Sequence, residues 1–154
     1  PYLREYGREY TEYEVSMTAL TAKHFRHIAI IHNIFLRSAI RYNMNKYLFI
    51  DTEAIVTKIF LEMYSTKHSW DSDYGVIDGI IEEQINEINL YLLLYPDLEW
   101  EDDGSRQPED AEYRLDNFNK IEAELIKHGV KYFVIKGDNR LEQAIKIIEN
   151  YENI

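Results

Sequence analysis

The residues with the most evident chemistry lie at 99–106, in the order Glu-Trp-Glu-Asp-Asp-Gly-Ser-Arg. They follow an apolar run at 90–95 that is predicted to be a strand, and open α/β sheets bind ligands at the carboxyl ends of their strands. The guanidinium of Arg106 offers a planar fork suited to phosphate, and Asp102 and Asp103 can orient it or face a metal-bound nucleotide. Acidic loops are common in acidic proteins, so on this segment alone a solvated loop is favoured over a site.

Two further segments place acidic residues at strand ends. The sequence F-I-D-T at 49–52 ends a predicted strand with Asp51, which suits magnesium binding through water or general-base chemistry. An aspartate at this position can instead cap the following helix. The sequence E-Y-G-R-E at 5–9 places Glu5 at the end of a predicted first strand. Together, these two segments shift the balance toward a site, although for Asp51 alone the capping role is slightly favoured.

The three motifs together carry a family resemblance. With E-Y-G-R-E at 5–9, F-I-D-T at 49–52 and E-W-x-D-D-G-x-R at 99–106 in this order, the chain resembles the bacterial and phage ribosylnicotinamide kinases. These enzymes are the P-loop kinase domain of the NAD-salvage protein that carries an adenylyltransferase domain in some bacteria. The resemblance runs from Tyr2 to the C-terminal helix, and the first and third motifs are its specific part.

The resemblance implies a fold and an activity. The expected fold is α/β, a three-layer P-loop kinase-like domain with a parallel sheet. The expected activity is ATP- and magnesium-dependent phosphorylation of a nucleoside, with nicotinamide riboside converted to nicotinamide mononucleotide in NAD salvage. The alternative of another class is a non-catalytic kinase-like domain that binds nucleotides or serves as a regulator or interaction module.

The resemblance also assigns site residues. Glu5 is expected to accept the proton of the 5′-hydroxyl or to hold the ribose, Asp51 to act in catalysis and bind magnesium, and Arg106 to clamp phosphate from a lid. Other residues implied in substrate binding are Arg8, Glu9, His32, Asp102 and Asp103. The turn at Lys136 and Gly137 is expected to lie against the adenine of ATP. Arg8 with Glu9 can also be an ion pair on a helix, and the turn can be an ordinary strand-to-helix connection.

Two other features qualify the chemistry. His24, His27 and His32 have spacings of three and five, which do not place all three on one helix face, so packing or hydrogen bonding is expected in place of metal binding. Arg4 stands where these kinases usually have a tryptophan that stacks on nicotinamide. A guanidinium there repels the pyridinium of nicotinamide riboside, so "a nucleoside or small phosphoryl acceptor" is the broader expectation.

The phosphate-binding loop is absent from the sequence. No G-x-x-x-x-G-K-[ST] occurs, and the six glycines are scattered. In the family this loop and the central strand of the sheet come just before the position of Pro1. The strands ending at Asp51 and Tyr95 are therefore expected to flank an empty place, with residues 1–154 forming one N-terminally incomplete domain that is incomplete for catalysis on its own.

Composition fits a soluble domain with small-molecule partners. A chain of 154 residues with 45% hydrophobic residues can bury one core, and the net charge of −11 argues against nucleic-acid binding. No cysteine occurs, which fits a reducing cytoplasm, and no apolar run has transmembrane length, so no membrane partner is expected. The expected ligands are the nucleoside, ATP and Mg²⁺; an assembly of identical chains is left open.

Hydrophobic periodicity predicts alternating helices and strands. The predicted order is a first strand ending near residue 3, a helix at 17–42, a strand at 46–50, a helix capped by Thr52 that runs to 63, a loop at 65–74, a helix at 76–87, a strand at 90–94, a helix at 108–128 ended by Gly129, a strand at 131–135 and a helix at 140–151. Strands separated by helices imply a parallel sheet with right-handed crossovers.

Overall fold

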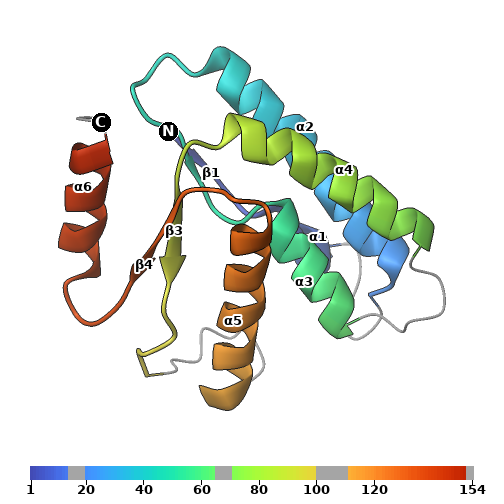
Figure 1. The fold of residues 1–154 in the computed structure, drawn as a ribbon. Helices are drawn as coiled ribbons and strands as arrows, with labels where there is room; N and C mark the ends of the chain where they lie inside the picture. The colour runs from blue at the N-terminus through green and yellow to red at the C-terminus, as the bar shows by residue number, and fades with distance from the viewer. Residues whose placement is uncertain (14–19, 65–70, 100–110, 152–154) are drawn as a thin grey trace. The chain divides into compact units, whose positions relative to one another are not determined.

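The computed structural model describes residues 1–13, 20–64, 71–99 and 111–151, which divide into two compact units, Pro1–Glu87 and Ile88–Ile154 (Figure 1). The first unit contains β1 (Tyr2–Leu3), α1 (Tyr6–Tyr13), α2 (Ala22–Tyr42), β2 (Phe49–Ile50), α3 (Ala54–Tyr64) and α4 (Asp71–Glu87). The second contains β3 (Tyr91–Leu94), α5 (Ala111–Lys127), β4 (Tyr132–Ile135) and α6 (Arg140–Tyr151). No described helix combines the length and the apolar character that crossing a membrane requires.

Strands β1 and β2 form a short parallel pair in the first unit. Tyr2 is paired with Phe49 and Leu3 with Ile50. The backbone N–H of Asp51 also donates to the carbonyl of Leu3 at 3.0 Å, so the pairing continues one residue past β2. The predicted strand at 46–50 is therefore present only in its last two residues, and the predicted first strand is confirmed.

Helices α2, α3 and α4 pack together and hold the core of this unit, with α2 and α4 running side by side in Figure 1. Their inward faces carry side chains that are nearly free of solvent: Phe25, Ile28 and Leu36 from α2, Ile55, Ile59 and Leu61 from α3, and Ile77, Ile80 and Ile81 from α4. The spacing of three and four between these residues is what turns them to one face of each helix.

The start of α4 differs from the sequence prediction. Residues 71–74 were expected in a loop, but the helix begins at Asp71. Asp73 is buried and pairs with Arg26 at 2.7 Å, and the hydroxyl of Tyr74 donates to Glu62. Polar partners on α2 and α3 thus stabilise a helical turn at 71–74, although the composition of this segment is typical of a loop.

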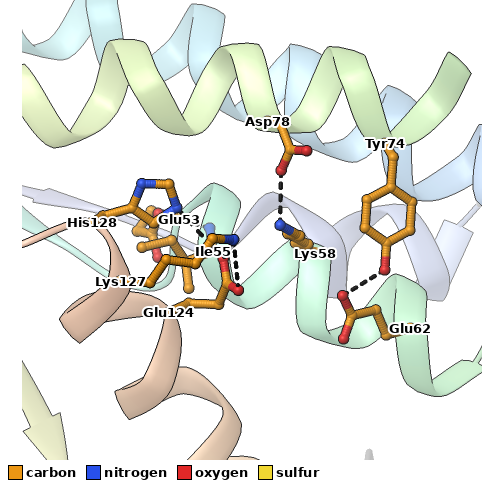
Figure 2. A network of polar contacts seen from close by, with 9 residues as sticks. All are labelled: Glu53, Ile55, Lys58, Glu62, Tyr74, Asp78, Glu124, Lys127 and His128. Carbon is orange, nitrogen blue, oxygen red and sulfur yellow. Dashed lines mark hydrogen bonds and ion pairs between the residues drawn. The ribbon is translucent and has the colours of Figure 1, made fainter. Parts of the chain in front are cut away.

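A buried lysine also joins α3 to α4. Lys58 is 5% exposed, and its Nζ lies 2.8 Å from a carboxylate oxygen of Asp78. Figure 2 shows this pair beside the bond between Tyr74 and Glu62, and the Lys58 ammonium also lies over the Tyr74 ring at 5.5 Å. A buried charge needs such partners, because losing one of them leaves the other desolvated and unpaired.

Helix α3 begins one residue later than predicted, and Glu53 caps it in place of Thr52. An oxygen of the Glu53 carboxyl accepts the N–H of Ile55 at 2.8 Å, and the Glu53 carbonyl accepts the N–H of Thr57 at 3.1 Å. Thr52 has φ of 61°, a left-handed conformation that is rare for a β-branched residue. The chain therefore turns sharply between the sheet and the helix. Burial raises the pKa of Glu53 to about 7, although its bonds to the N–H groups of Ile55 and Val56 oppose that shift.

The second unit pairs β3 with β4 in parallel, from Tyr91 beside Tyr132 to Leu94 beside Ile135. Phe118 and Leu125 of α5 and Ile135 of β4 are buried. Helix α5 ends at Lys127, and Gly129 with φ of 65° follows it, as its position predicted. The described strands thus form two parallel sheets of two strands each, which confirms parallel pairing with helical crossovers.

We predict that Glu53 makes the protein less stable as pH rises. Its pKa is raised in the folded state, from 4.5 to about 7, so the folded chain keeps a proton that the unfolded chain has lost. The stabilising effect is fully present below pH 4.5 and is lost as pH rises through 7, by about 3 kcal/mol in all. Urea unfolding of wild type and Glu53→Gln between pH 4.5 and 8 measures this difference.

The Glu53→Gln variant is the control for the other titrating groups, which it shares with wild type. In Glu53→Gln the amide can still cap α3 but cannot ionise, so the wild-type free energy should fall relative to the variant as pH rises. A constant difference across this range would contradict the assignment of a protonated Glu53 in the folded protein.

Candidate functional site

The predicted acids Glu5 and Asp51 lie at the same edge of the β1–β2 pair. Each follows the carboxyl end of its strand, and the strands are parallel neighbours. The N–H of Asp51 is bonded to the carbonyl of Leu3, two residues before Glu5. Glu5 is half-buried and lies over Gly7, where an added Cβ would be 3.5 Å from its Oε1. The sequence therefore placed these two carboxylates correctly relative to their strands.

The carboxylate of Asp51 is exposed but bonded. The hydroxyl of Tyr2, on β1, donates to its Oδ2 at 2.7 Å. This bond to the carboxylate is the largest cause that raises the pKa of Tyr2 above its ordinary value. Tyr2 was not among the predicted site residues, because a tyrosine in a strand of two residues gives no sequence signal of its own.

His32 is buried within reach of the charge of Asp51. It lies on α2 and is 3% exposed, and its Nε2 has no hydrogen-bond partner among the described residues. Burial lowers the pKa of His32, while the negative charge of Asp51 opposes that shift. At neutral pH the ring is therefore an uncharged imidazole, in which one nitrogen donates a hydrogen bond and the other accepts one. Depending on the tautomer, Nε2 can do either. A buried polar atom without a partner is a candidate contact for a ligand.

A buried amide ties the helices behind this edge. Gln84 of α4 is 1% exposed, and its amide nitrogen donates to Oδ1 of Asn33 on α2 at 3.0 Å. Its amide oxygen accepts the N–H of Ala54, the first residue of α3, also at 3.0 Å. Asn33 in turn donates to Glu83 at 3.1 Å. This network was not predicted from the sequence. Its signal in the sequence was Asn33 and Gln84, two polar residues on the apolar faces of predicted helices.

The other predicted residues of the first unit are mostly in α1. Glu9 is exposed, and the side chain of Arg8 lies outside the described residues. Next to them the ring of Tyr6 contacts Phe35 at 5.7 Å between centroids and Tyr10 at 6.0 Å. An aromatic surface thus adjoins the residues predicted to bind substrate.

The three histidines have separate surroundings. The Nδ1 of His24 accepts the N–H of Thr21 at 3.0 Å and so helps to cap α2, which begins at Ala22. The predicted start of this helix, at residue 17, lies outside the described residues. The ring of His27 packs against Tyr10 at 5.3 Å. Within the described ranges, no three acidic or histidine side chains are grouped so as to hold a metal ion.

The predicted lid, with Asp102, Asp103 and Arg106, lies outside the described residues. The segment that leads into it is fixed within the second unit. Asp97 accepts the N–H of Gly137 at 2.8 Å and pairs with Arg140, which also donates to the carbonyl of Tyr95 at 2.7 Å. These contacts lower the pKa of Asp97, the bond from Gly137 most of all.

The predicted adenine turn at Lys136 and Gly137 is already bonded within its own unit. The carbonyl of Lys136 accepts from the amide of Gln143 at 2.6 Å, and its N–H donates to the same amide at 3.4 Å. Gly137 has φ of 76°, which a residue with a side chain rarely adopts. These bonds hold the strand-to-helix turn together, and the contact of this turn with adenine stays a prediction.

Comparisons with known proteins support the fold. A family model described as an AAA domain matches residues 1–142. The crystal structure of NadR protein in complex with NR has a TM-score of 0.82 and 21% identity, and covers 100% of this chain and 44% of that one. The crystal structure of NadR protein in complex with NAD and AMP-PNP has a TM-score of 0.80 and 22% identity, and covers 100% and 42%.

This chain therefore spans less than half the length of either structure. A search of curated proteins gave no match. At this level of identity the likeness shows the fold, and the P-loop kinase-like α/β class predicted from the motifs is confirmed.

We predict that the buried amide of Gln84 is needed for stability. Gln84→Met keeps the length of the side chain but leaves the N–H of Ala54 and the Oδ1 of Asn33 buried without a partner. Such a loss should lower the free energy of unfolding by about 2 kcal/mol. Urea unfolding compares it with Glu87→Met, an exposed site on the same helix, which should change stability by less than about 0.5 kcal/mol. Equal effects of the two variants would show that the amide contributes nothing specific.

Proposed function

The chain belongs to the AAA-domain family matched over residues 1–142, and from that premise we propose that it is the kinase domain of a nucleoside kinase. The proposed reaction transfers phosphate from ATP to a nucleoside 5′-hydroxyl, with nicotinamide riboside as the first candidate and nicotinamide mononucleotide as its product. The observation that carries the proposal is the pair of carboxylates, Glu5 and Asp51, at the carboxyl edge of two parallel strands. The similar structures with NR and with AMP-PNP support this ligand class.

The two carboxylates have different proposed roles. Glu5 accepts the proton of the attacking hydroxyl or holds the ribose. Asp51 offers exposed oxygen ligands, which Mg²⁺ prefers, and one or two carboxylates together with nucleotide phosphates make up its usual protein site. Phosphoryl transfer depends mainly on positioning and on neutralising charge, so holding both side chains at one edge is the useful feature.

His32 is proposed to contact the sugar. Its buried Nε2 has no partner among the described residues, and its imidazole is uncharged at neutral pH because burial lowers its pKa. An uncharged imidazole can hydrogen-bond a ribose hydroxyl without adding charge to the site. Arg8 and Glu9, which lie on α1 shortly after Glu5 in the sequence, complete the proposed nucleoside contacts in this unit.

The remaining assignments concern the second unit. Arg106 is proposed to clamp the transferred phosphate, and Asp102 and Asp103 to lie near the sugar or the metal. The pair of Asp97 with Arg140 fixes the chain a few residues before this segment. Adenine is proposed to lie against Lys136 and Gly137, where pairing with the Lys136 backbone requires the Gln143 amide to move aside.

Kinases of this fold bind the phosphates of ATP with the backbone N–H groups and the lysine of a G-x-x-x-x-G-K-[ST] loop. This motif does not occur in the 154 residues. The activity is therefore tested on the protein expressed from its complete reading frame. We propose that a phosphate-binding loop outside these 154 residues completes the site.

We predict turnover of a nucleoside that requires ATP and Mg²⁺, measured by coupled ADP release over a panel that includes nicotinamide riboside. Arg106→Ala should lower kcat by about three orders of magnitude, because its charge acts on the transition state. Arg41→Ala, an exposed arginine at the end of α2, is the matched control and should leave the rate unchanged. If the folded complete protein turns over no nucleoside, the non-catalytic binding domain becomes the better interpretation.

Asp51→Asn tests the metal role. We predict that it raises the Mg²⁺ concentration for half-maximal rate while thermal unfolding stays close to wild type, because the side chain is exposed. Asp116→Asn, an exposed aspartate of α5, is the control and should leave the Mg²⁺ requirement unchanged. An unaltered Mg²⁺ requirement in Asp51→Asn would remove Asp51 from the metal site.

Substitution of Arg4 tests which nucleobase the phosphoryl acceptor carries. We predict that Arg4→Trp lowers KM for nicotinamide riboside but not for an uncharged nucleoside, because it removes a cation facing the pyridinium. Equal effects on both acceptors would show that charge repulsion at this position does not set specificity.

A further inference from the structure

We propose that Tyr2 is a positioning residue, which holds the Asp51 carboxylate in one orientation so that its other oxygen faces the bound ligands. The hydrogen bond itself is a property of the fold. Its catalytic consequence rests on the proposed function, and the two parts are tested separately below.

The register of the strands makes this contact possible. Tyr2 is paired with Phe49, and side chains alternate along a strand, so Tyr2, Phe49 and Asp51 project from the same face of the β1–β2 pair. Because Asp51 lies two residues beyond Phe49, a side chain at position 2 must lean along the strand to reach it. The length of a tyrosine side chain suits this diagonal reach, and its hydroxyl lies 2.7 Å from Oδ2.

The bond is of the stronger kind. An O–H donor to an ionised carboxylate makes a charge-assisted hydrogen bond, and a distance of 2.7 Å is typical of a well-formed one. Both groups face solvent, with Tyr2 58% exposed. Packing of the Tyr2 ring alone would not explain why its hydroxyl points at this carboxylate.

The backbone at Asp51 is held on both sides, while its side chain depends on Tyr2. The N–H of Asp51 is bonded to Leu3, and Glu53 starts α3 after the left-handed turn at Thr52. Among the described residues, Tyr2 is the group seen to bond the Asp51 carboxylate. Since the bond uses Oδ2, Oδ1 is left for the metal or the substrate.

The surrounding charges explain why a neutral donor suits this place. The bond to Asp51 is the largest cause that raises the pKa of Tyr2; among the smaller causes, the charge of Arg4, just after β1, lowers this pKa and the charge of Glu5 raises it. The charge of Asp51 also opposes the lowering of the His32 pKa by burial. A lysine or arginine at position 2 would neutralise the carboxylate that the proposed site needs. A phenol fixes the carboxylate and leaves its negative charge.

The first test measures the orientation of Asp51 without any activity assay. Three-bond NMR couplings from the backbone nitrogen and carbonyl carbon to Cγ of Asp51 report whether χ1 has one value. We expect one rotamer in wild type and averaging over several in Tyr2→Phe. Tyr42→Phe, which removes an exposed hydroxyl from the end of α2, should match wild type. Averaging already in wild type, or one rotamer in Tyr2→Phe, would overturn the proposal.

The second test is a double-mutant cycle on kcat in the complete protein. Tyr2→Phe should lower kcat about threefold to tenfold, the equivalent of one hydrogen bond, with a smaller change in KM for the nucleoside. In an Asp51→Asn background, the same substitution should cost nothing further, because Tyr2 acts through Asp51. A merely structural role would instead give equal losses in both backgrounds.

The two tests fail in different ways. Absence of turnover in wild type would remove the proposed kinase function, while the NMR couplings would still decide whether Tyr2 holds Asp51. Turnover with additive losses would keep the kinase and remove Tyr2 as a positioning residue.

Discussion

The first unit depends on the buried amide of Gln84, which uses both of its ends. Its nitrogen donates to Asn33 in the middle of α2, and its oxygen accepts the first N–H of α3. An N–H at the start of a helix has no partner inside that helix, so a buried start needs one from elsewhere. One side chain of α4 therefore fixes where α3 begins and how it lies against α2.

The position of Asp51 follows from that constraint. The three residues 51–53 connect β2 to α3, with the backbone of Asp51 bonded to β1 and the side chain of Glu53 bonded into the helix. The left-handed φ at Thr52 is tolerated because both flanks are fixed. Because β1 and β2 are parallel neighbours, the acid after β2 and the acid after β1 lie at the same edge of the pair. The polar core and the proposed site are therefore parts of one arrangement.

The sequence predicted what local pattern can specify. Apolar spacing predicted α2 to α6, whereas α1 (Tyr6–Tyr13) was not predicted. An acid after each of two strands located Glu5 and Asp51. The start of α4 was missed because Asp73 and Tyr74 resemble loop residues until Arg26 and Glu62 are brought to them by the fold. Glu53 as cap and Tyr2 as partner of Asp51 were missed for a related reason. A glutamate is expected to stay in solvent, and a pairing across 49 positions leaves no trace in local spacing.

In the proposed function, a nucleoside binds at the carboxyl edge of β1 and β2 with its 5′-hydroxyl at Glu5. A crystal structure of the complete protein with nicotinamide riboside and a non-hydrolysable ATP analogue tests this most directly. We expect the 5′-oxygen about 3 Å from the Glu5 carboxylate, with Asp51 facing the metal and Nε2 of His32 bonded to the ribose. A riboside bound away from this edge, with Glu5 and Asp51 both facing solvent, would contradict it.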